Sequence, residues 1–179
     1  MSFYRIKLYV IIYKMICDVF IEISKDSNIK YEYDKELGGI RLDRVLKSSM
    51  VYPENYGYIP NTLADDGDAL DVVLVADYPL VPGSYVRSRI VGVLEMEDEK
   101  GIDHKIIAVP ATEVDSTYEY VNNIDDLPQS RLNKIKFFFE NYKQLDHDKW
   151  AIVNSYQNKD DAITIYNNSL CNNNKKISD

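Results

Sequence analysis

The segment Asp65-Asp66-Gly67-Asp68-Ala69-Leu70-Asp71 stands directly before the apolar run Val72-Val73-Leu74-Val75. An apolar run of this length after turn residues predicts a buried β-strand. Four carboxylates within seven residues repel one another, and a cation among them would stabilise the cluster. A solvated acidic turn explains this segment alone equally well, because aspartate and glycine are also preferred turn residues.

Two known patterns of closely spaced aspartates do not fit this segment. A calcium-binding EF-hand loop that starts at Asp66 would put Leu70 at a ligand position and Asp71 where the turn glycine belongs. A phosphatase of the aspartyl-phosphate type needs its apolar strand before the acidic residues, whereas here the strand follows them. The spacing disfavours both classes of protein.

Further strand patterns lie on both sides of the acidic segment. They are residues 19–23, 30–33, 39–42, 85–94 and 105–109. Turn residues and prolines separate them, and the prolines are Pro53, Pro60, Pro79, Pro82 and Pro110. Short strands punctuated in this way predict a small, closed or partly open antiparallel β-barrel of the OB-like type.

The pattern changes from strand to helix after Pro128. Residues 129–142 place Leu132, Ile135, Phe138 or Phe139 and Tyr142 on one helical stripe, and proline is tolerated in a first helical turn. A second, weaker helix is expected from about residue 159 to 170. The fold class is therefore α+β, a barrel flanked by two or so helices.

Charge limits the range of partners. The 179 residues contain 29 acidic and 21 basic side chains, which gives a net charge of −8. This balance disfavours a broad basic surface for nucleic acid or for an anionic membrane, so neither is expected as a partner. A small anion held through metal ions remains compatible with it.

Cysteine and histidine are scarce. Cys17 and Cys171 are far apart in sequence, so no disulfide framework or CxxC motif is available, and a reducing, cytoplasmic location is expected. With only His104 and His147, a multi-histidine metal site cannot form. Any metal must be bound by oxygen, as magnesium, calcium or manganese are.

The domain organisation is simple. Residues 1–16 contain three basic side chains, no acid and a short apolar run interrupted by Lys14, without a cleavage site or the length of a membrane span. We expect residues 1–17 to be an N-terminal extension or strand, residues 18–171 a single catalytic domain, and residues 172–179 a polar, frayed tail.

A second acidic stretch, residues 95–105, lies between two apolar runs and contains a turn glycine. Alone, it is well explained as a charged hairpin tip. Cations and phenols stand elsewhere at strand or helix ends, among them Lys30, Arg44, Tyr52, Tyr56, Lys105, Tyr142 and Lys143. If these converge, carboxylates can hold magnesium while the cations and phenols bind phosphate oxygens, as in metal-assisted phosphoryl transfer.

Six short motifs follow one another in the chain. They are Glu22-Ile23 with Lys30-Tyr31-Glu32; Asp43-Arg44; Tyr52-Pro53-Glu54-Asn55-Tyr56-Gly57-Tyr58; Asp66-Gly67-Asp68-Ala69-Leu70-Asp71; Gly92-Val93-Leu94 with Asp98-Glu99 and Asp103-His104-Lys105; and Phe138-Phe139-Glu140-Asn141-Tyr142-Lys143 with Lys149-Trp150. In this order they resemble motifs of the family I soluble inorganic pyrophosphatases, from residue 18 to about 156. Two positions depart from the family pattern, Ser24 and Ala69, and neither removes a charged group.

The resemblance implies Mg²⁺-dependent hydrolysis of inorganic pyrophosphate to two phosphates. Asp66, Asp71 and Asp103 would hold the first of several magnesium ions, with Asp71 shared with a second, and manganese could substitute. Asp68 would be the general base that leaves a metal-bridged hydroxide to attack directly. The resemblance places further metal positions near four residues, Glu22, Glu32, Asp98 and Glu99.

Substrate binding is implied for the remaining members of the site, Lys30, Arg44, Tyr52, Tyr56, Lys105, Tyr142 and Lys143. Packing in the core is the alternative for the tyrosines, and a surface ion pair is the alternative for Arg44. Resemblance to bacterial members also implies a homo-oligomer, a hexamer built from trimers. Three other functions stay open: a metal-binding module without catalysis, an OB-type nucleic-acid-binding barrel, and a magnesium hydrolase of nucleoside polyphosphates.

Overall fold

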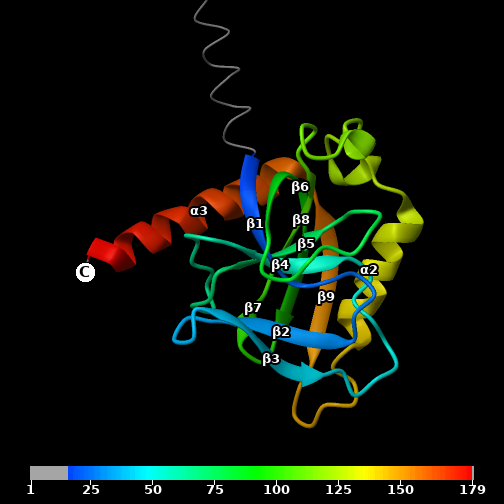
Figure 1. The fold of residues 1–179 in the computed structure, drawn as a ribbon, viewed down its shortest axis with the longest axis vertical. Coiled ribbons are helices and arrows are strands. Elements are labelled where there is room, and N and C mark those ends of the chain that lie inside the picture. The colour runs from blue at the N-terminus through cyan, green and yellow to red at the C-terminus, as the bar shows by residue number, and fades with distance from the viewer. Residues whose placement is uncertain (1–15, 179) are drawn as a thin grey trace, which may run out of the picture.

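The computed structural model describes residues 16–178, and a closed barrel of five strands lies at its centre (Figure 1). In the order in which they pair, the strands are β1 (Ile16–Ile23), β4 (Asn55–Ile59), β5 (Leu70–Leu74), β8 (Lys105–Pro110) and β6 (Tyr85–Asp98). The long strand β6 also pairs with β1, the first strand in this order, and this pairing closes the barrel. The expected α+β class with a small OB-like barrel is confirmed.

One pairing differs from the antiparallel arrangement that the sequence suggested. β5 and β8 run parallel, with Val72 opposite Ile106, whereas the other neighbouring pairs of the barrel are antiparallel. The reason is topological: a closed ring with an odd number of strands cannot alternate direction throughout, so one neighbouring pair must be parallel. The barrel is therefore mixed.

The remaining elements surround the barrel. β2 (Ile29–Asp34) and β3 (Gly39–Val45) form a separate two-stranded hairpin, and β7 (Gly101–Ile102) and β9 (Ala151–Gln157) pair with β6. Two short 3-10 helices, η1 (Ser116–Tyr118) and η2 (Ile124–Asp126), precede α2 (Gln129–Asn141), and α3 (Lys159–Ser178) follows β9. In Figure 1 the hairpin lies below the barrel, while α2 and α3 lie on different sides of it.

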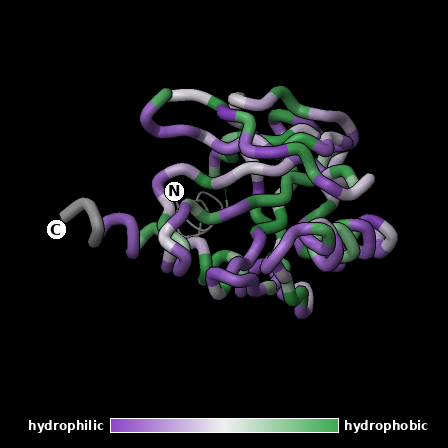
Figure 2. The backbone as a smooth tube through the Cα atoms, turned by 90° about the horizontal axis from the view of Figure 1, so that it is seen from below, coloured by the Kyte–Doolittle hydropathy of each residue, from purple (hydrophilic) through white to green (hydrophobic). Residues whose placement is uncertain are grey.

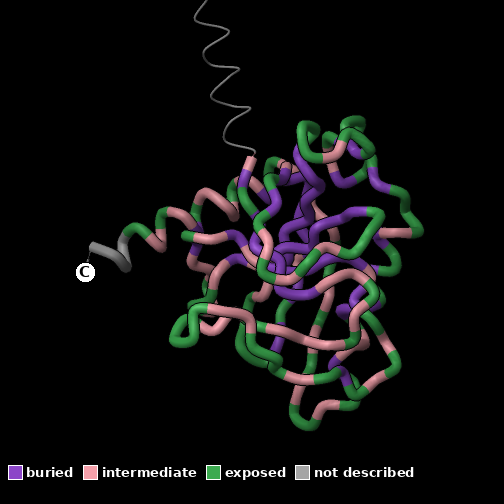
Figure 3. The backbone as a smooth tube through the Cα atoms, in the orientation of Figure 1, coloured by how far each residue is buried: buried purple, intermediate pink, exposed green. Residues whose placement is uncertain are grey.

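The apolar run in β5 is buried on both faces of the strand. Val72 and Leu74 belong to one hydrophobic cluster, which α3 covers through Ala162, while Val73 belongs to a second cluster that contains Ile135 of α2. Burial on both faces explains why the run is continuous rather than alternating. The apolar and buried parts of the chain accordingly gather in its centre in Figures 2 and 3.

The helices agree with their sequence patterns in part. In α2 the buried side chains are Leu132, Ile135, Phe138 and Phe139, which is the expected stripe. The second helix was expected to end near residue 170, but α3 continues to Ser178, so the backbone of residues 172–178 is helical rather than frayed. The expectations for residues 1–15 lie outside the described residues, and residues 16 and 17 belong to β1.

Gly57 allows β1 and β4 to approach each other closely. A Cβ atom at this position would lie 1.8 Å from the carbonyl oxygen of Phe20 on β1. No side chain fits in that space, so the pairing of the two strands depends on glycine here. This contact fixes β4 beside β1 next to Tyr56. Between residues 16 and 178 no helix is both long and apolar enough to span a membrane.

Candidate functional site

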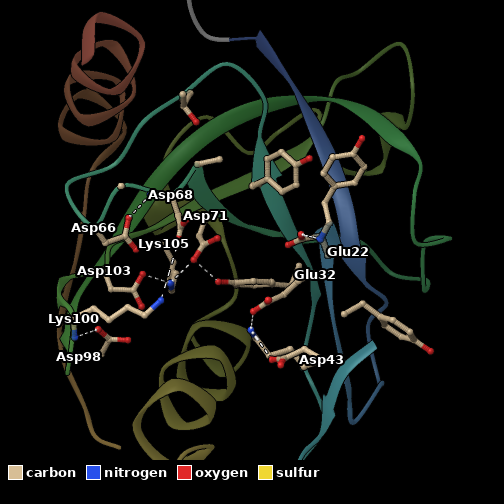
Figure 4. A pocket seen from close by; sticks show the side chains of 18 of the residues that line it. Glu22, Glu32, Asp43, Asp66, Asp68, Asp71, Asp98, Lys100, Asp103 and Lys105 are labelled. Carbon is tan, nitrogen blue, oxygen red and sulfur yellow. Dashed lines mark hydrogen bonds and ion pairs between the residues drawn. The ribbon is translucent and has the colours of Figure 1, made fainter. Parts of the chain in front are cut away.

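A cleft of about 830 Å³ opens between one end of the barrel, the β2–β3 hairpin and the end of α2. Its lining contains all the residues that the sequence assigned to the site except Tyr52. They are Glu22, Lys30, Glu32, Arg44, Tyr56, Asp66, Asp68, Asp71, Asp98, Glu99, Asp103, Lys105, Tyr142 and Lys143. Residues that span more than 120 positions of sequence thus converge on one cavity (Figure 4).

The acidic segment before β5 forms one wall of the cleft. Gly67 has a φ of +88°, a conformation that suits glycine and lets the chain turn between two aspartates. The turn is held by the backbone N–H of Asp68, which donates to Asp66 Oδ1 at 3.0 Å. Burial, together with the negative charges of Asp68 and Asp71, raises the pKa of Asp66 above its ordinary value. Burial is the largest of these effects.

Asp68 itself is the most accessible of these carboxylates. Its side chain is 72% exposed, and the ammonium group of Lys100 lies 4.0 Å from Asp68 Oδ2. No other side-chain partner of its carboxylate occurs among the described contacts. A carboxylate that is exposed to the cleft and weakly paired is free to accept a proton from a water molecule.

The floor of the cleft is a tight polar cluster around Asp71. The hydroxyl of Tyr56 and the ammonium group of Lys105 each donate to Asp71 Oδ2 at 2.6 Å, and Lys105 also donates to Asp103. Burial raises the pKa of Asp103 to about 6, and the charge of Asp71 adds to the effect while Lys105 opposes it. Figure 4 shows Asp66, Asp71 and Asp103 gathered near Lys105.

Another wall comes from the end of β6 and the end of α2. Lys143 Nζ lies 2.7 Å from Asp98 Oδ2 and 3.0 Å from Glu99 Oε2. Burial opposes ionisation of both carboxyl groups, but hydrogen bonds from Lys143 and from backbone amides outweigh it, so both pKa values are lowered. Tyr142, the residue after α2, stacks on Phe138 with 5.1 Å between ring centroids.

The opposite wall is formed by β1 and the β2–β3 hairpin. Glu22 accepts the backbone N–H of Tyr33 at 2.7 Å, and burial raises the pKa of Glu22 to about 7. Lys30 pairs with Glu32 and, at 3.2 Å, with Asp43 Oδ2. Arg44 Nε lies 3.7 Å from the same oxygen of Asp43, so part of its charge is already balanced at this wall.

Tyr52 does not line the cleft. It is 2% exposed and packs against Phe138 and Tyr56, with ring centroids 4.6 and 5.5 Å away. The structure thus gives this residue the core position that was the alternative interpretation of its motif.

The cleft lining also contains residues that the sequence did not assign to the site, among them Asp43, Lys149 and Asn173. Asp43 and Lys149 belong to the quoted Asp43-Arg44 and Lys149-Trp150 motifs, so these motifs could have indicated them. Asn173 arrives from α3, which was expected to end before it. No sequence signal pointed to Asn173.

The donor set of the cleft suits a hard cation. It consists of carboxylate oxygens, and several lie close enough to disfavour joint ionisation, a situation that a divalent cation relieves. Within residues 16–178, however, no group of three or more His, Cys, Asp or Glu side chains is positioned to hold a metal as it stands. Lys105 instead lies between Asp71 and Asp103. The chemistry therefore fits a hard divalent cation, which would have to displace the ammonium group of Lys105 from Asp71 and Asp103.

Comparison with known proteins agrees with this geometry. Residues 19–174 match the family profile described as inorganic pyrophosphatase. The chain is 51% identical to an inorganic pyrophosphatase of Helicobacter pylori over 152 residues, which cover 85% of this chain and 88% of that protein. The chain belongs to the inorganic pyrophosphatase family. The resemblance inferred from six motifs and the assignment as an enzyme are thereby confirmed.

Other relatives of this family support the same conclusion. An inorganic pyrophosphatase of Saccharolobus solfataricus is 50% identical over 139 residues, which cover 78% of this chain and 81% of that protein. The solved structure of the Helicobacter pylori pyrophosphatase matches with a TM-score of 0.88 at 48% identity, over 90% of this chain and 95% of that one. The Thermus thermophilus pyrophosphatase structure matches with a TM-score of 0.86 at 41% identity, over 89% and 92%.

Proposed function

We propose that this chain hydrolyses inorganic pyrophosphate to two phosphates in a Mg²⁺-dependent reaction without a covalent enzyme intermediate. The observation that supports this most strongly is the convergence of eight candidate carboxylates and the lysine, arginine and tyrosine side chains on one cleft, in a member of the inorganic pyrophosphatase family. Pyrophosphate is compact and highly charged, so a site for it needs both metal-binding oxygens and cationic donors.

Three residues would hold the first magnesium ion, namely Asp66, Asp71 and Asp103. The residues around further metal positions would be Glu22, Glu32, Asp98 and Glu99. When bound, Mg²⁺ would polarise the phosphoryl oxygens and lower the pKa of a water molecule. The buried ammonium group of Lys105 donates to both Asp71 and Asp103, and these contacts hold the two carboxylates together in the floor of the cleft.

Asp68 would act as the general base that accepts a proton from the attacking water. Its exposure and its weak pairing with Lys100 support this role, since a carboxylate locked in a strong ion pair is a poor proton acceptor. The turn that follows Asp66 directs it to the same side of the cleft as the proposed metal ligands, as Figure 4 shows.

The cationic and phenolic side chains would bind the diphosphate oxygens and stabilise the negative charge on the leaving phosphate. They are Lys30, Arg44, Tyr56, Lys105, Tyr142 and Lys143. We propose for Tyr52 a supporting role beneath Tyr56, because it packs on that ring and does not line the cleft. Lys30, Lys105 and Lys143 now pair with carboxylates of their own wall or of the floor, namely Glu32, Asp71 and Asp98, and these carboxylates would become available to the metal when substrate binds the cations.

The decisive experiment measures phosphate release from pyrophosphate at near-neutral pH, with and without Mg²⁺ and with Mn²⁺ in its place. The proposal expects release that depends on the divalent ion. Absence of release would refute it, and release from nucleoside triphosphates alone would favour the nucleotide hydrolase considered above. The Asp68→Asn variant should lose turnover by about 10² to 10⁴-fold while it keeps Mg²⁺ binding. A fully active variant would remove Asp68 from the role of base.

We further propose that one domain, expected over residues 18–171, carries this activity in the cytoplasm as a homohexamer built from trimers. The family match over residues 19–174 supports the single domain. The scarcity of cysteine, two residues in 179, supports a reducing location. Sizing chromatography with light scattering tests the assembly, and a monomeric mass for the active enzyme would refute it.

A further inference from the structure

A buried ion-pair network lies at the end of α2 that is remote from the cleft. Glu54, directly before β4, is only 3% exposed. Arg131, in the first turn of α2, contacts both of its carboxylate oxygens: Nε donates to Oε1, and Nη2 donates to Oε2 at 3.0 Å. Such a two-pronged contact fixes orientation as well as distance.

The network also ties Arg131 to other parts of the barrel. Its Nη2 donates to the backbone oxygen of Ala76, after β5, at 2.6 Å, and its Nη1 lies 3.1 Å from Asp77 Oδ1 and 2.5 Å from the hydroxyl of Tyr118 on η1. Lys25 adds contacts to Glu54 Oε2 at 3.3 Å and to the Ala76 oxygen at 3.2 Å. One guanidinium group therefore joins α2 to the segments before β4 and after β5.

Stabilisation of the helix itself does not explain why an arginine stands in the first turn of α2. The first turn of α2 has no side-chain cap and no acidic residue, and a cation near a helix N-terminus interacts unfavourably with the helix dipole. A buried ion pair is also weak evidence for stability, because its desolvation cost is large. The pair instead links the first turn of α2 to the barrel, and such a link restricts the angle between them.

That angle matters at the other end of the helix, where Tyr142 and Lys143 enter the cleft. Arg131 and Tyr142 are eleven residues apart, which corresponds to about 16 Å along a helix. A tilt of α2 would therefore move Tyr142 and Lys143 relative to Tyr56, which follows Glu54 by two residues on β4. Displacements of about 1 Å in a catalytic site can reduce rates by about 100-fold.

We propose that Arg131 and Glu54 are positioning residues, whose paired side chains set the angle of α2 so that Tyr142 and Lys143 meet the phosphate groups. Neither residue lines the cleft. The inference rests on the proposed function, because it assumes that Tyr142 and Lys143 bind substrate. It assigns a role to a pair that the six motifs do not explain.

A double-mutant cycle between Arg131→Met and Tyr142→Phe tests the coupling. For distant residues without shared partners, the fold-loss of the double variant normally equals the product of the two single fold-losses to within about twofold. We expect Arg131→Met to lower kcat/KM for pyrophosphate about tenfold or more. We also expect the fold-loss of kcat/KM caused by Tyr142→Phe to be at least about threefold smaller in the Arg131→Met background than in the wild type. Effects that multiply within twofold would refute the proposal.

Two further variants keep this test decisive. Arg131→Lys retains the charge beside Glu54 but removes the two-pronged contact, so it replaces Arg131→Met in the cycle if that variant does not fold. Lys134→Met removes a cation from an exposed position on the same helix, outside the network, and should leave kcat/KM within about twofold of the wild type. A loss in Lys134→Met equal to that in Arg131→Met would also refute the proposal.

Hydrogen exchange gives a readout that does not depend on activity. The backbone N–H of Tyr142 donates to the oxygen of Phe138 at 2.8 Å in the last turn of α2. We expect faster exchange of this amide in Arg131→Lys but not in Lys134→Met. If the wild type released no phosphate, the proposed function would fail, while faster exchange would still establish the link from Arg131 to the end of the helix. Unchanged exchange would refute that link.

Discussion

The ammonium group of Lys105 lies 2.6 Å from Asp71 Oδ2 and is almost fully buried in the floor of the cleft. Burial alone would lower the pKa of Lys105, but the charges of Asp71 and Asp103 outweigh it and raise the pKa. Lys105 therefore stays charged and holds two carboxylates together. In the proposed reaction it competes with magnesium for the same oxygens.

Replacement of Lys105 by methionine should thus change metal binding and turnover in opposite directions. Without the competing cation, Mg²⁺ should bind about tenfold more tightly in the absence of substrate, because the two carboxylates lose their neutralising partner. Turnover should fall by about 10² or more, because a charge that stabilises the phosphate is lost. Calorimetric titration with Mg²⁺ and a phosphate-release assay measure the two effects.

Lys100→Met is the matched control for this change. Lys100 is exposed, and its nearest carboxylate oxygen, on Asp68, is 4.0 Å away, so its removal should alter Mg²⁺ affinity by less than about threefold. Weaker Mg²⁺ binding by the Lys105→Met protein would contradict the idea of competition.

The stability of the metal-free protein should depend on pH in a direction set by Glu22 and Asp103. Burial raises their pKa values in the folded state to about 7 and about 6. Protons therefore bind more tightly to the folded than to the unfolded chain, and the free energy of unfolding should fall as pH rises from about 4.5 to 7. Each group contributes a slope of at most about 1.4 kcal/mol per pH unit.

Urea unfolding with EDTA at pH 5, 6, 7 and 8 measures this dependence. The lowered pKa values of Asp98 and Glu99 affect the free energy of unfolding only at pH values below the ordinary pKa values of these groups. The raised pKa of Lys105 affects it only above about pH 10, so none of these groups contributes between pH 5 and 8. Glu22→Gln should flatten the curve, and saturating Mg²⁺ should restore stability at high pH. A metal-free protein that becomes more stable between pH 5 and 7 would show that these carboxyl groups are not protonated as expected.

Gly57→Ala should destabilise the fold severely. The new methyl group would meet the backbone of Phe20, which cannot move without breaking the pairing of β1 with β4, so we expect a loss of about 3 kcal/mol or more. Gly39→Ala is the control, since no atom lies within 4 Å of the place that its Cβ would take, and its effect should stay within about 1 kcal/mol. Thermal melting compares the two, and equal melting temperatures would contradict the close approach.

The two thiols should differ in reactivity. Burial raises the pKa of the Cys17 thiol to about 12, whereas Cys171 is exposed on α3. A thiol reacts as the thiolate and must be accessible, so at about pH 8 a disulfide reagent should titrate one thiol rapidly in the native protein and two in urea. The Cys171→Ser variant should show no rapid reaction before unfolding. Rapid reaction of that variant would mean that β1 opens at Cys17.

The sequence predicted the barrel well because its strands have strong local signals. The run that follows Asp71 is apolar on both faces, and the stripe from Leu132 to Phe139 has a clear helical period. The parallel pairing of β5 and β8 has no local signal, since it follows from how many strands close the ring. The length of α3 was missed because its last turns are rich in asparagine, which has a low intrinsic preference for helix.

The site could be predicted as a set of residues but not as a network. Fourteen of its fifteen expected members line the cleft because their motifs carry chemistry that can be recognised in sequence. Tyr52 lies in the core instead of the cleft lining. A tyrosine in a turn can serve the core or the cleft equally well, and only packing decides. The pair of Glu54 and Arg131 could not be predicted, because its members are 77 positions apart and no local pattern links one to the other.

The parallel contact between β5 and β8 has a consequence for how the enzyme matures. It brings Asp71 beside Lys105, 34 positions later in the chain, and the long strand β6, which pairs with β8, lies between them in sequence. Contacts between parallel strands that are distant in sequence form slowly during folding. Asp71 and Lys105 therefore come together only once β5 and β8 have paired, and a chain in which this pair has not formed lacks the floor of the cleft.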